Sequence, residues 1–295
     1  MIIIKIMGGL TSQMHKYALG RVLSLKYNVP LKLDLTWFDN PKSDTPWEYQ
    51  LDYFNINATI ATVSEIKKLK GNNLFNRIAR KIEKFFSIRI YKKSYINKSF
   101  ISISDFHKLK SDIYLDGEWN GFKYFEDYQD TIKNELTLKR GSSINIQNTI
   151  KELKSSDNSV FLHIRRGDYL SNKNAAAFHA KCSLDYYYKA IQIVKEKIDN
   201  PIFYIFSDDI LWVKKNFVIN ESCRFMEKNQ NFEDLLLMSY CKHGITANSG
   251  FSLMAGWLNQ NKDKMIIVPQ TWVNDDRINI NILNSLEQDN FTIIR

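Results

Sequence analysis

Short apolar runs alternate with segments of helical periodicity along this chain. The first run, residues 2–6, is rich in isoleucine and ends at Gly8 and Gly9, so it predicts a strand buried on both faces. Apolar side chains then recur at helical spacing over residues 12–25, and residues 31–35 form a second apolar run. The N-terminal region is therefore predicted to form a β-loop-α-β unit.

The same alternation returns beyond residue 159, after a polar stretch over residues 151–159 that resembles a linker. Apolar runs predict strands over residues 160–164, 202–206, 223–226, 244–247 and 265–268. Helical spacing predicts helices over residues 184–198, 232–242 and 250–259 and near Trp212. Strands that alternate with helices are typical of parallel sheets, which bind ligands at the carboxyl ends of their strands. We therefore expect an α/β fold of two doubly wound, Rossmann-like lobes, residues 1–155 and 156–295, with a cleft between them.

Composition is that of a globular protein. Hydrophobic residues make up 44% and charged residues 25% of the 295 residues, which excludes the disordered and collagen-like classes. Cys182, Cys223 and Cys241 lack CxxC spacing, so neither a disulfide framework nor a zinc knuckle is predicted. No apolar run approaches the roughly 20 residues of a membrane-spanning helix. A cytoplasmic location is expected.

The net charge of +9 indicates an anionic partner: nucleic acid, an acidic membrane surface or a phosphorylated ligand. Ten lysines and arginines and a single acid occur over residues 66–93, where apolar positions recur at helical spacing. This pattern predicts a basic amphipathic helix that either packs on the core or rests on the inner face of a membrane. No nucleic-acid-binding signature accompanies the charge, so nucleic acid is not an expected partner.

Two predicted helix starts follow strands and offer backbone N–H groups. Gly8 and Gly9 either hold a phosphate or form a tight structural turn, and their spacing is not the GxGxxG of a dinucleotide site. Asn248, Ser249 and Ser252 follow the strand at 244–247 and add amide and hydroxyl groups. Both segments are candidates for binding an anion.

The stretch HIRRGDY follows the strand at 160–164 and carries the strongest anion-binding chemistry. Strand alternation places His163 and Arg165 on one face. The planar fork of an arginine suits two phosphate oxygens, so Arg165, next to Arg166, is a candidate diphosphate ligand. Asp168 either ties an arginine in place or takes a proton.

Paired acids follow the strand at 202–206. Asp208 and Asp209, after Ser207, either hold a divalent metal that carries a nucleoside diphosphate or cap the next helix.

Together these segments resemble the bacterial α-1,2-fucosyltransferases, inverting glycosyltransferases of family 11, over nearly the whole chain. GGLTSQMHKYALGRVLS is similar to the family pattern GGLGNQMFQYAFGRALA, and HIRRGDY matches its HxRRxDY motif. Four further segments that resemble the family follow in its usual order: residues 118–136, 182–191, 207–212 and 233–259.

The resemblance implies a GT-B-like fold in which residues 1–155, with the basic insertion, form the acceptor side and residues 156–295 bind a GDP-sugar. It implies transfer of L-fucose from GDP-β-L-fucose to the 2-hydroxyl of a terminal galactoside, on an oligosaccharide or a lipid-linked glycan, without metal or cofactor. The donor-binding residues expected are Gly8, Gly9, Gln13, His163, Arg165, Arg166, Ser207, Asp208, Asn248, Ser249, Phe251 and Ser252. The predicted catalytic residues are Arg165, on the β-phosphate, and Asp168, as general base.

The chain departs from the family pattern in three places. Thr11, Ser12, His15 and Lys16 differ from the family pattern in the N-terminal motif. Asn120 and Gly121 differ from it in the segment over residues 118–136, and Leu253 and Met254 in the segment over residues 233–259. These replacements leave the motifs that bind GDP intact, and they leave the identity of the acceptor undetermined. Two alternatives therefore stay open: a transferase for another GDP-6-deoxyhexose, and a metal-dependent glycosyltransferase that uses Asp208 and Asp209.

Overall fold

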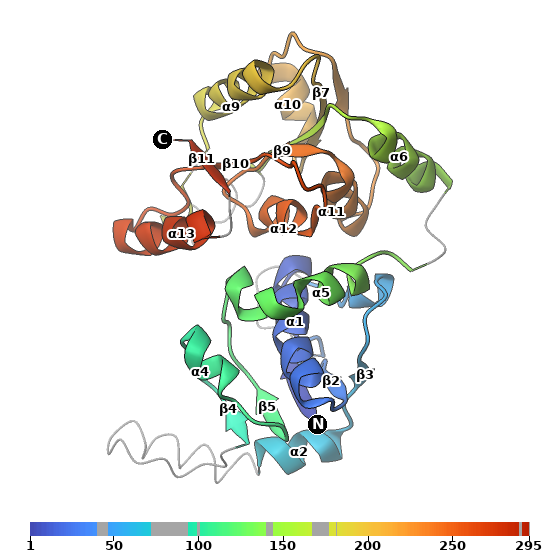
Figure 1. Cartoon of the computed structure of the whole chain (residues 1–295), viewed down its shortest axis with the longest axis vertical. Coiled ribbons are helices and arrows are strands. Elements are labelled where there is room, and N and C mark those ends of the chain that lie inside the picture. Colours follow the sequence, from blue (N-terminus) through green and yellow to red (C-terminus); the bar gives the residue numbers. More distant parts are fainter. Residues whose placement is uncertain are drawn as a thin grey trace. The chain divides into compact units, whose positions relative to one another are not determined.

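The computed structural model describes residues 1–39, 47–71, 94–98, 101–139, 144–166, 177–180, 182–288 and 291–294. These residues form two compact units, Met1–Lys139 and Arg140–Arg295, and each unit is built around its own parallel sheet (Figure 1). The predicted α/β class with two parallel sheets is confirmed.

The first unit has a five-stranded sheet in the order β3-β2-β1-β5-β4. Its elements are β1 (Ile2–Lys5), α1 (Leu10–Tyr27), β2 (Leu31–Asp34), η1 (Leu51–Tyr53), β3 (Thr59–Ile60), α2 (Val63–Lys70), β4 (Tyr95–Ile96), α4 (Ile103–His107), β5 (Ile113–Leu115), η2 (Phe122–Tyr128) and α5 (Gln129–Glu135). Gly20 of α1 packs against Ile4 and Leu31, while α2 covers the opposite side chains of Ile3 and Tyr114. Helices therefore cover both faces.

The second unit has a six-stranded parallel sheet in the order β11-β10-β9-β6-β7-β8. Its elements are α6 (Ile144–Ser155), β6 (Ser159–Ile164), α9 (Leu184–Lys197), β7 (Ile202–Ser207), α10 (Ile210–Asn216), β8 (Cys223–Phe225), α11 (Asn231–Tyr240), β9 (His243–Ile245), α12 (Gly250–Leu258), β10 (Ile266–Pro269), α13 (Asp276–Gln288) and β11 (Thr292–Ile294). In Figure 1, α9 and α10 lie on one face of this sheet and α11 and α12 on the other. Side chains of β6 and β7 pack against α9 in one apolar core.

In each sheet, strands are added first on one side of a central strand and later on its other side. In the first unit the chain runs from β1 outward to β2 and β3, and β5 then pairs with the other edge of β1. In the second unit it runs from β6 to β7 and β8, and β9 then pairs with the other edge of β6. Open α/β sheets bind ligands at such switch points, outside the carboxyl ends of the strands.

Two expectations about chain organisation need correction. The polar stretch over residues 151–159 is not a linker: it contains the last turns of α6 and the start of β6. The two units divide after Lys139, earlier than the expected boundary after residue 155. The reason is that α6 buries Ile146 and Leu153 and packs on α11 of the second unit.

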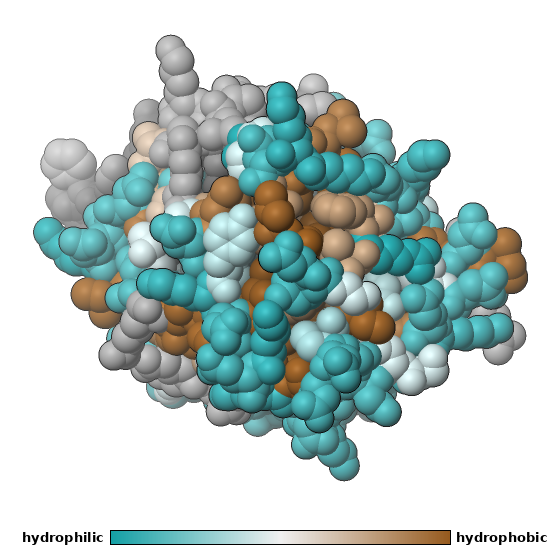
Figure 2. Space-filling view, turned by 90° about the horizontal axis from the view of Figure 1, so that it is seen from above, coloured by the Kyte–Doolittle hydropathy of each residue, from teal (hydrophilic) through white to brown (hydrophobic). Residues whose placement is uncertain are grey.

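The predicted basic helix over residues 66–93 lies largely outside the described residues, of which only 66–71 belong to it, as the last turns of α2 and its C-cap. The face seen in Figure 2 carries mainly hydrophilic side chains with smaller apolar patches between them. Among the described helices, none combines the length and the apolar character needed to cross a bilayer.

Candidate active site

Three of the predicted clusters lie side by side in the second unit. β6 is flanked by β7 and β9, and Ile164 at the end of β6 is in register with Ser207 at the end of β7. The residues after these strands therefore emerge at the same edge of the sheet. The segment after β9 leads into α12 on the other side of β6. This edge is the switch point of the unit.

Arg165 and Asp208 form an ion pair across the ends of β6 and β7. The Arg165 Nε lies 3.1 Å from Asp208 Oδ2, and both side chains keep about a quarter of their surface exposed. The Arg166 backbone N–H donates to Asp208 Oδ1 at 2.9 Å. One carboxylate therefore holds both the side chain of Arg165 and the backbone that follows it.

Arg166 is held by an aromatic ring. Its guanidinium carbon lies 3.2 Å from the centroid of the Trp212 ring, and its Nε lies 3.6 Å from Asp209 Oδ2. That Nε is buried and makes no hydrogen bond to a described residue. Stacking on an aromatic face fixes the plane of a guanidinium while its N–H groups still point outward. The support from Trp212 was not predicted, although the segment SDDILW contains that residue.

The two acids of this edge have different partners. Asp209 is the N-cap of α10 and accepts the Trp212 backbone N–H at 3.2 Å, so the capping alternative holds for this residue. The Ser207 hydroxyl accepts the Asp209 backbone N–H at 3.0 Å. Asp208 instead pairs with the Arg165 side chain and accepts the Arg166 backbone N–H, whereas Asp209 adds an ion pair with Arg166 to its capping role. In the described ranges, no three histidines, cysteines or acids gather as a metal site would require.

His163 and α12 meet across the switch point. The buried His163 Nδ1 lies 2.9 Å from Ser252 Oγ, and its ring is 5.7 Å from that of Phe251. Burial, with the positive charge of Arg165, lowers the pKa of His163 to about 3. Ser249 caps α12 by accepting the Phe251 N–H at 3.3 Å. A neutral imidazole therefore lies beside a capped helix start.

Asn248 is buried, and its side chain is committed to the protein. Its Nδ2 donates to the carbonyls of Ala180 and Trp272, the latter at 3.0 Å, and its Oδ1 accepts from Cys182 Sγ at 3.4 Å. The hydrogen bonds of the Asn248 amide therefore fix the segment before α12.

The glycine turn belongs to the first unit, at the end of β1. Gly8 has φ +77°, a conformation that favours glycine, and a Cβ on Gly9 would lie 3.2 Å from the Trp47 ring. The buried Gln13 donates to the carbonyls of Gly8 and Glu48 and accepts from the Gln50 N–H. Gln13 thus braces the turn with its whole amide group.

The predicted base, Asp168, lies outside the described residues. The described part of the second-unit site consists of two oriented guanidinium groups, a neutral imidazole and the N-terminal amides of α12. Such a set binds an anion with more than one oxygen and stabilises charge that develops on it.

The chain has the GT-B-like fold of a glycosyltransferase, as the comparisons with known proteins show. The fucosyltransferase NodZ from Bradyrhizobium matches with a TM-score of 0.51 at 13% identity, over 86% of this chain and 91% of that chain, and has also been co-crystallised with GDP. The chain matches glycosyl transferase family 11 over residues 47–293, and it belongs to this family.

Two relatives from Escherichia coli align along almost their whole length. The alpha-1,2-colitosyltransferase is 33% identical over 286 residues, 94% of both chains. The O-antigen biosynthesis glycosyltransferase WbnK is 31% identical over 285 residues, 90% of this chain and 92% of that one. The predicted family is confirmed, and the sugar that is transferred is not fixed by these names.

Proposed function

We propose that this enzyme transfers L-fucose from GDP-β-L-fucose to the 2-hydroxyl of a terminal galactoside and forms an α linkage. The observation that carries the proposal is the pair Arg165 and Arg166, both oriented at the switch point of the second unit beside His163 and α12. A guanidinium pair next to helix N–H groups suits a nucleoside diphosphate. The name of WbnK supports an O-antigen glycan as the acceptor.

A second candidate donor is another GDP-deoxyhexose, and the relative named as a colitosyltransferase favours it. The two candidates share the GDP half and differ only in the hydroxyl groups of the sugar. The residues around the diphosphate do not distinguish them, so a donor comparison decides between them.

In the proposed reaction, the acceptor oxygen attacks C1 of the donor sugar while the bond from C1 to the β-phosphate oxygen breaks. GDP leaves with the bonding electrons, and its diphosphate gains negative charge. Arg165 stabilises that negative charge, and Arg166 and the backbone amides of α12 contribute beside it. Asp168 takes the acceptor proton. The configuration at C1 inverts from β to α.

We propose that the step needs no metal ion. The support is that both acids of the SDD segment already have partners: Asp208 binds the arginines and Asp209 caps α10. Cationic side chains then supply the charge stabilisation that a metal provides in other transferases. Full turnover after treatment with EDTA is the expected result, and a loss that Mg²⁺ or Mn²⁺ restores would contradict it.

Arg165→Ala is the central test of the proposed function. Loss of one preorganised donor to the leaving group is expected to reduce kcat about 100- to 1,000-fold, measured with GDP-fucose and a galactoside acceptor. Arg224→Ala is the matched control, because Arg224 on β8 also pairs with a carboxylate, that of Glu152, at 2.9 Å. Near-full turnover of Arg165→Ala, or an equal loss in both variants, would contradict the assignment.

A further inference from the structure

The first unit has a switch point of its own, between β1 and β5. Two segments border it: the glycine turn after β1 and the loop over residues 116–121 after β5. In the turn, Gly9 lies against the Trp47 ring and Gln13 ties the backbone down. The loop after β5 also borders this edge and presents exposed side chains there.

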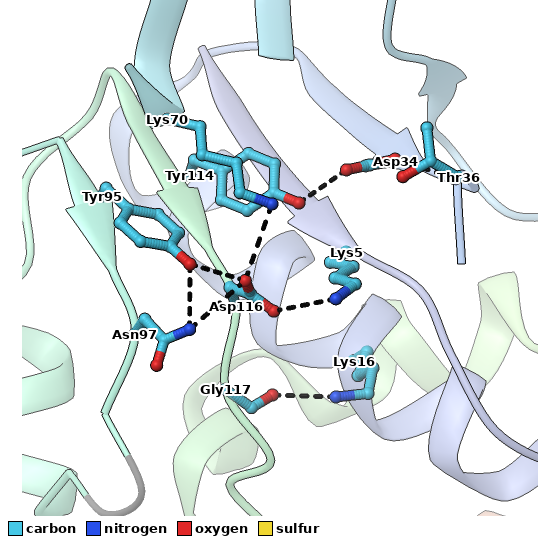
Figure 3. A network of polar contacts seen from close by, with 10 residues as sticks. All are labelled: Lys5, Lys16, Asp34, Thr36, Lys70, Tyr95, Asn97, Tyr114, Asp116 and Gly117. Carbon is cyan, nitrogen blue, oxygen red and sulfur yellow. Dashed lines mark hydrogen bonds and ion pairs between the residues drawn. The ribbon is translucent and has the colours of Figure 1, made fainter. Parts of the chain in front are cut away.

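A polar network anchors the start of this loop (Figure 3). The Asp116 carboxylate accepts from the Tyr95 hydroxyl at 2.8 Å and pairs with Lys5 at 3.4 Å. The neighbouring Gly117 carbonyl accepts from the Lys16 ammonium at 2.8 Å. The loop is thus tied to β4, β1 and α1 within its first two residues.

Trp119 fixes the middle of the loop. Its ring is buried and folds back over Gly117, where a Cβ would lie 2.3 Å from it, so only glycine fits there. Its indole N–H donates to the Lys98 carbonyl at 3.1 Å. Loop residues positioned by such a scaffold are preorganised for binding.

Lys16 places a buried positive charge beneath the loop. Its side chain is only 5% exposed, and its ammonium forms no ion pair with any described residue. Burial lowers its pKa, and the charges of Glu118 and Asp116 counteract that effect. A buried ammonium normally needs an opposite charge nearby. Here the nearby acids, Asp116 and Glu118, belong to the loop itself.

Glu118 and Asn120 are the side chains that the loop presents to solvent. They flank the buried Trp119, both are exposed, and neither makes a hydrogen bond or ion pair with the described residues. A carboxylate accepts two or more hydrogen bonds, and an amide both donates and accepts. This pair suits the neighbouring hydroxyl groups of a hexose.

On the basis of the proposed glycosyl transfer, we propose that the loop over residues 116–121 binds the acceptor sugar. Glu118 accepts hydrogen bonds from its hydroxyl groups, Asn120 bonds a neighbouring hydroxyl, and Lys16 is the positioning residue that holds the loop. The exposed carboxylate makes the acceptor a neutral hexose, because an acidic sugar would be repelled. The departures from the family pattern at Lys16 and Asn120 fall in this same group.

The test measures steady-state kinetics of Glu118→Gln and Asn120→Ala with GDP-fucose and a neutral galactoside. Loss of a charge-assisted hydrogen bond is expected to raise the acceptor KM about 10- to 100-fold, with the donor KM unchanged. Asp112→Asn is the matched control. Asp112 is an exposed acid at the other end of β5, and its φ of +58° also suits asparagine.

Lys16→Met tests the positioning role separately. It is expected to raise the acceptor KM while GDP still binds with its wild-type affinity in calorimetry, which reports on the folded second unit. If Lys16→Met fails to fold, Glu118→Gln still decides the proposal.

An unchanged acceptor KM in both Glu118→Gln and Asn120→Ala would overturn the proposal. So would a wild-type enzyme that prefers a uronic acid acceptor to the neutral galactoside. A wild-type enzyme that transfers no sugar from any GDP-deoxyhexose would instead contradict the proposed function, so the two failures are distinguishable.

Discussion

The environment of the buried His163 side chain determines both its orientation and its protonation state. Its Nδ1 contacts Ser252 Oγ at 2.9 Å, and burial together with Arg165 lowers its pKa to about 3. The imidazole is therefore neutral near pH 7. A neutral ring forms hydrogen bonds without adding to the positive charge of the two arginines.

The pKa of His163 also predicts how stability depends on pH. The unfolded chain binds a proton at this residue near pH 6.5, whereas the folded chain binds it only near pH 3. Acidification therefore favours the unfolded state across this window, and stability is lost as pH falls through it. The Tm of the wild-type enzyme is expected to fall more steeply from pH 6.5 to 4 than that of His163→Gln.

His15 acts in the same direction, because burial lowers its pKa to about 4, so the His163→Gln variant keeps part of the slope. Parallel Tm curves for the two proteins would contradict a neutral His163. The His15 ring stacks on Phe122 with the ring centroids 5.3 Å apart, and its Nδ1 lies 3.1 Å from the Thr11 carbonyl oxygen, so it combines an aromatic contact with a polar one.

At the scale of elements, β9 is placed by one close contact with β6. Gly244 is in register with Phe161, and a Cβ on Gly244 would lie 2.0 Å from the Phe161 ring. The ring of the central strand therefore occupies the space that a side chain on β9 would need. Because β9 leads to Ser249 and Ser252, this contact also sets the position of α12.

Gly244→Ala is accordingly expected to destabilise the protein by about 1–3 kcal/mol, since extra volume in a packed interior forces a shift. Thermal unfolding measures the effect. Phe161→Leu in the same chain should recover part of the loss, and the double-mutant cycle isolates the contact from the separate cost of the smaller side chain. Additive effects of the two substitutions would show that the ring and the glycine do not compete for space.

The elements predicted best from the sequence are the buried strands, since runs such as residues 2–6 and 160–164 have few other structures open to them. The helix α6 was missed because it buries only Ile146 and Leu153, and its last residues form a polar stretch that resembles a linker. Periodicity over so few apolar positions is too weak to distinguish a helix from a loop.

The site shows a similar limit. The residue types and their positions after strands were predicted, with Asp168 expected either to tie an arginine in place or to take a proton, but the pairing of Arg165 with Asp208 was not predicted. Asp168 lies outside the described residues, and the Arg165 side chain pairs with Asp208, which follows the neighbouring strand. Sheet order decides this pairing, and sheet order is a long-range property that local sequence does not report.

At the scale of the whole molecule, the chain consists of two doubly wound units, and each has chemistry at its own switch point. The second unit carries the arginines and α12, which suit a diphosphate, and the first carries Glu118 and Asn120, which suit hydroxyl groups. The proposed reaction needs both kinds of site, because its proposed donor is anionic and its proposed acceptor is neutral. The two sites are therefore expected to fill independently.

Amide hydrogen exchange with each ligand tests this division. GDP alone is expected to slow exchange at the ends of β6 and β7 and in the first turn of α12, because bound ligand suppresses local opening. Residues 116–121 are expected to keep their exchange rate in GDP and to slow when a galactoside is added. Arg165→Ala should lose the first response and keep the second. A GDP response confined to the first unit would place the nucleotide at the glycine turn, and the assignment of the two sites would then be reversed.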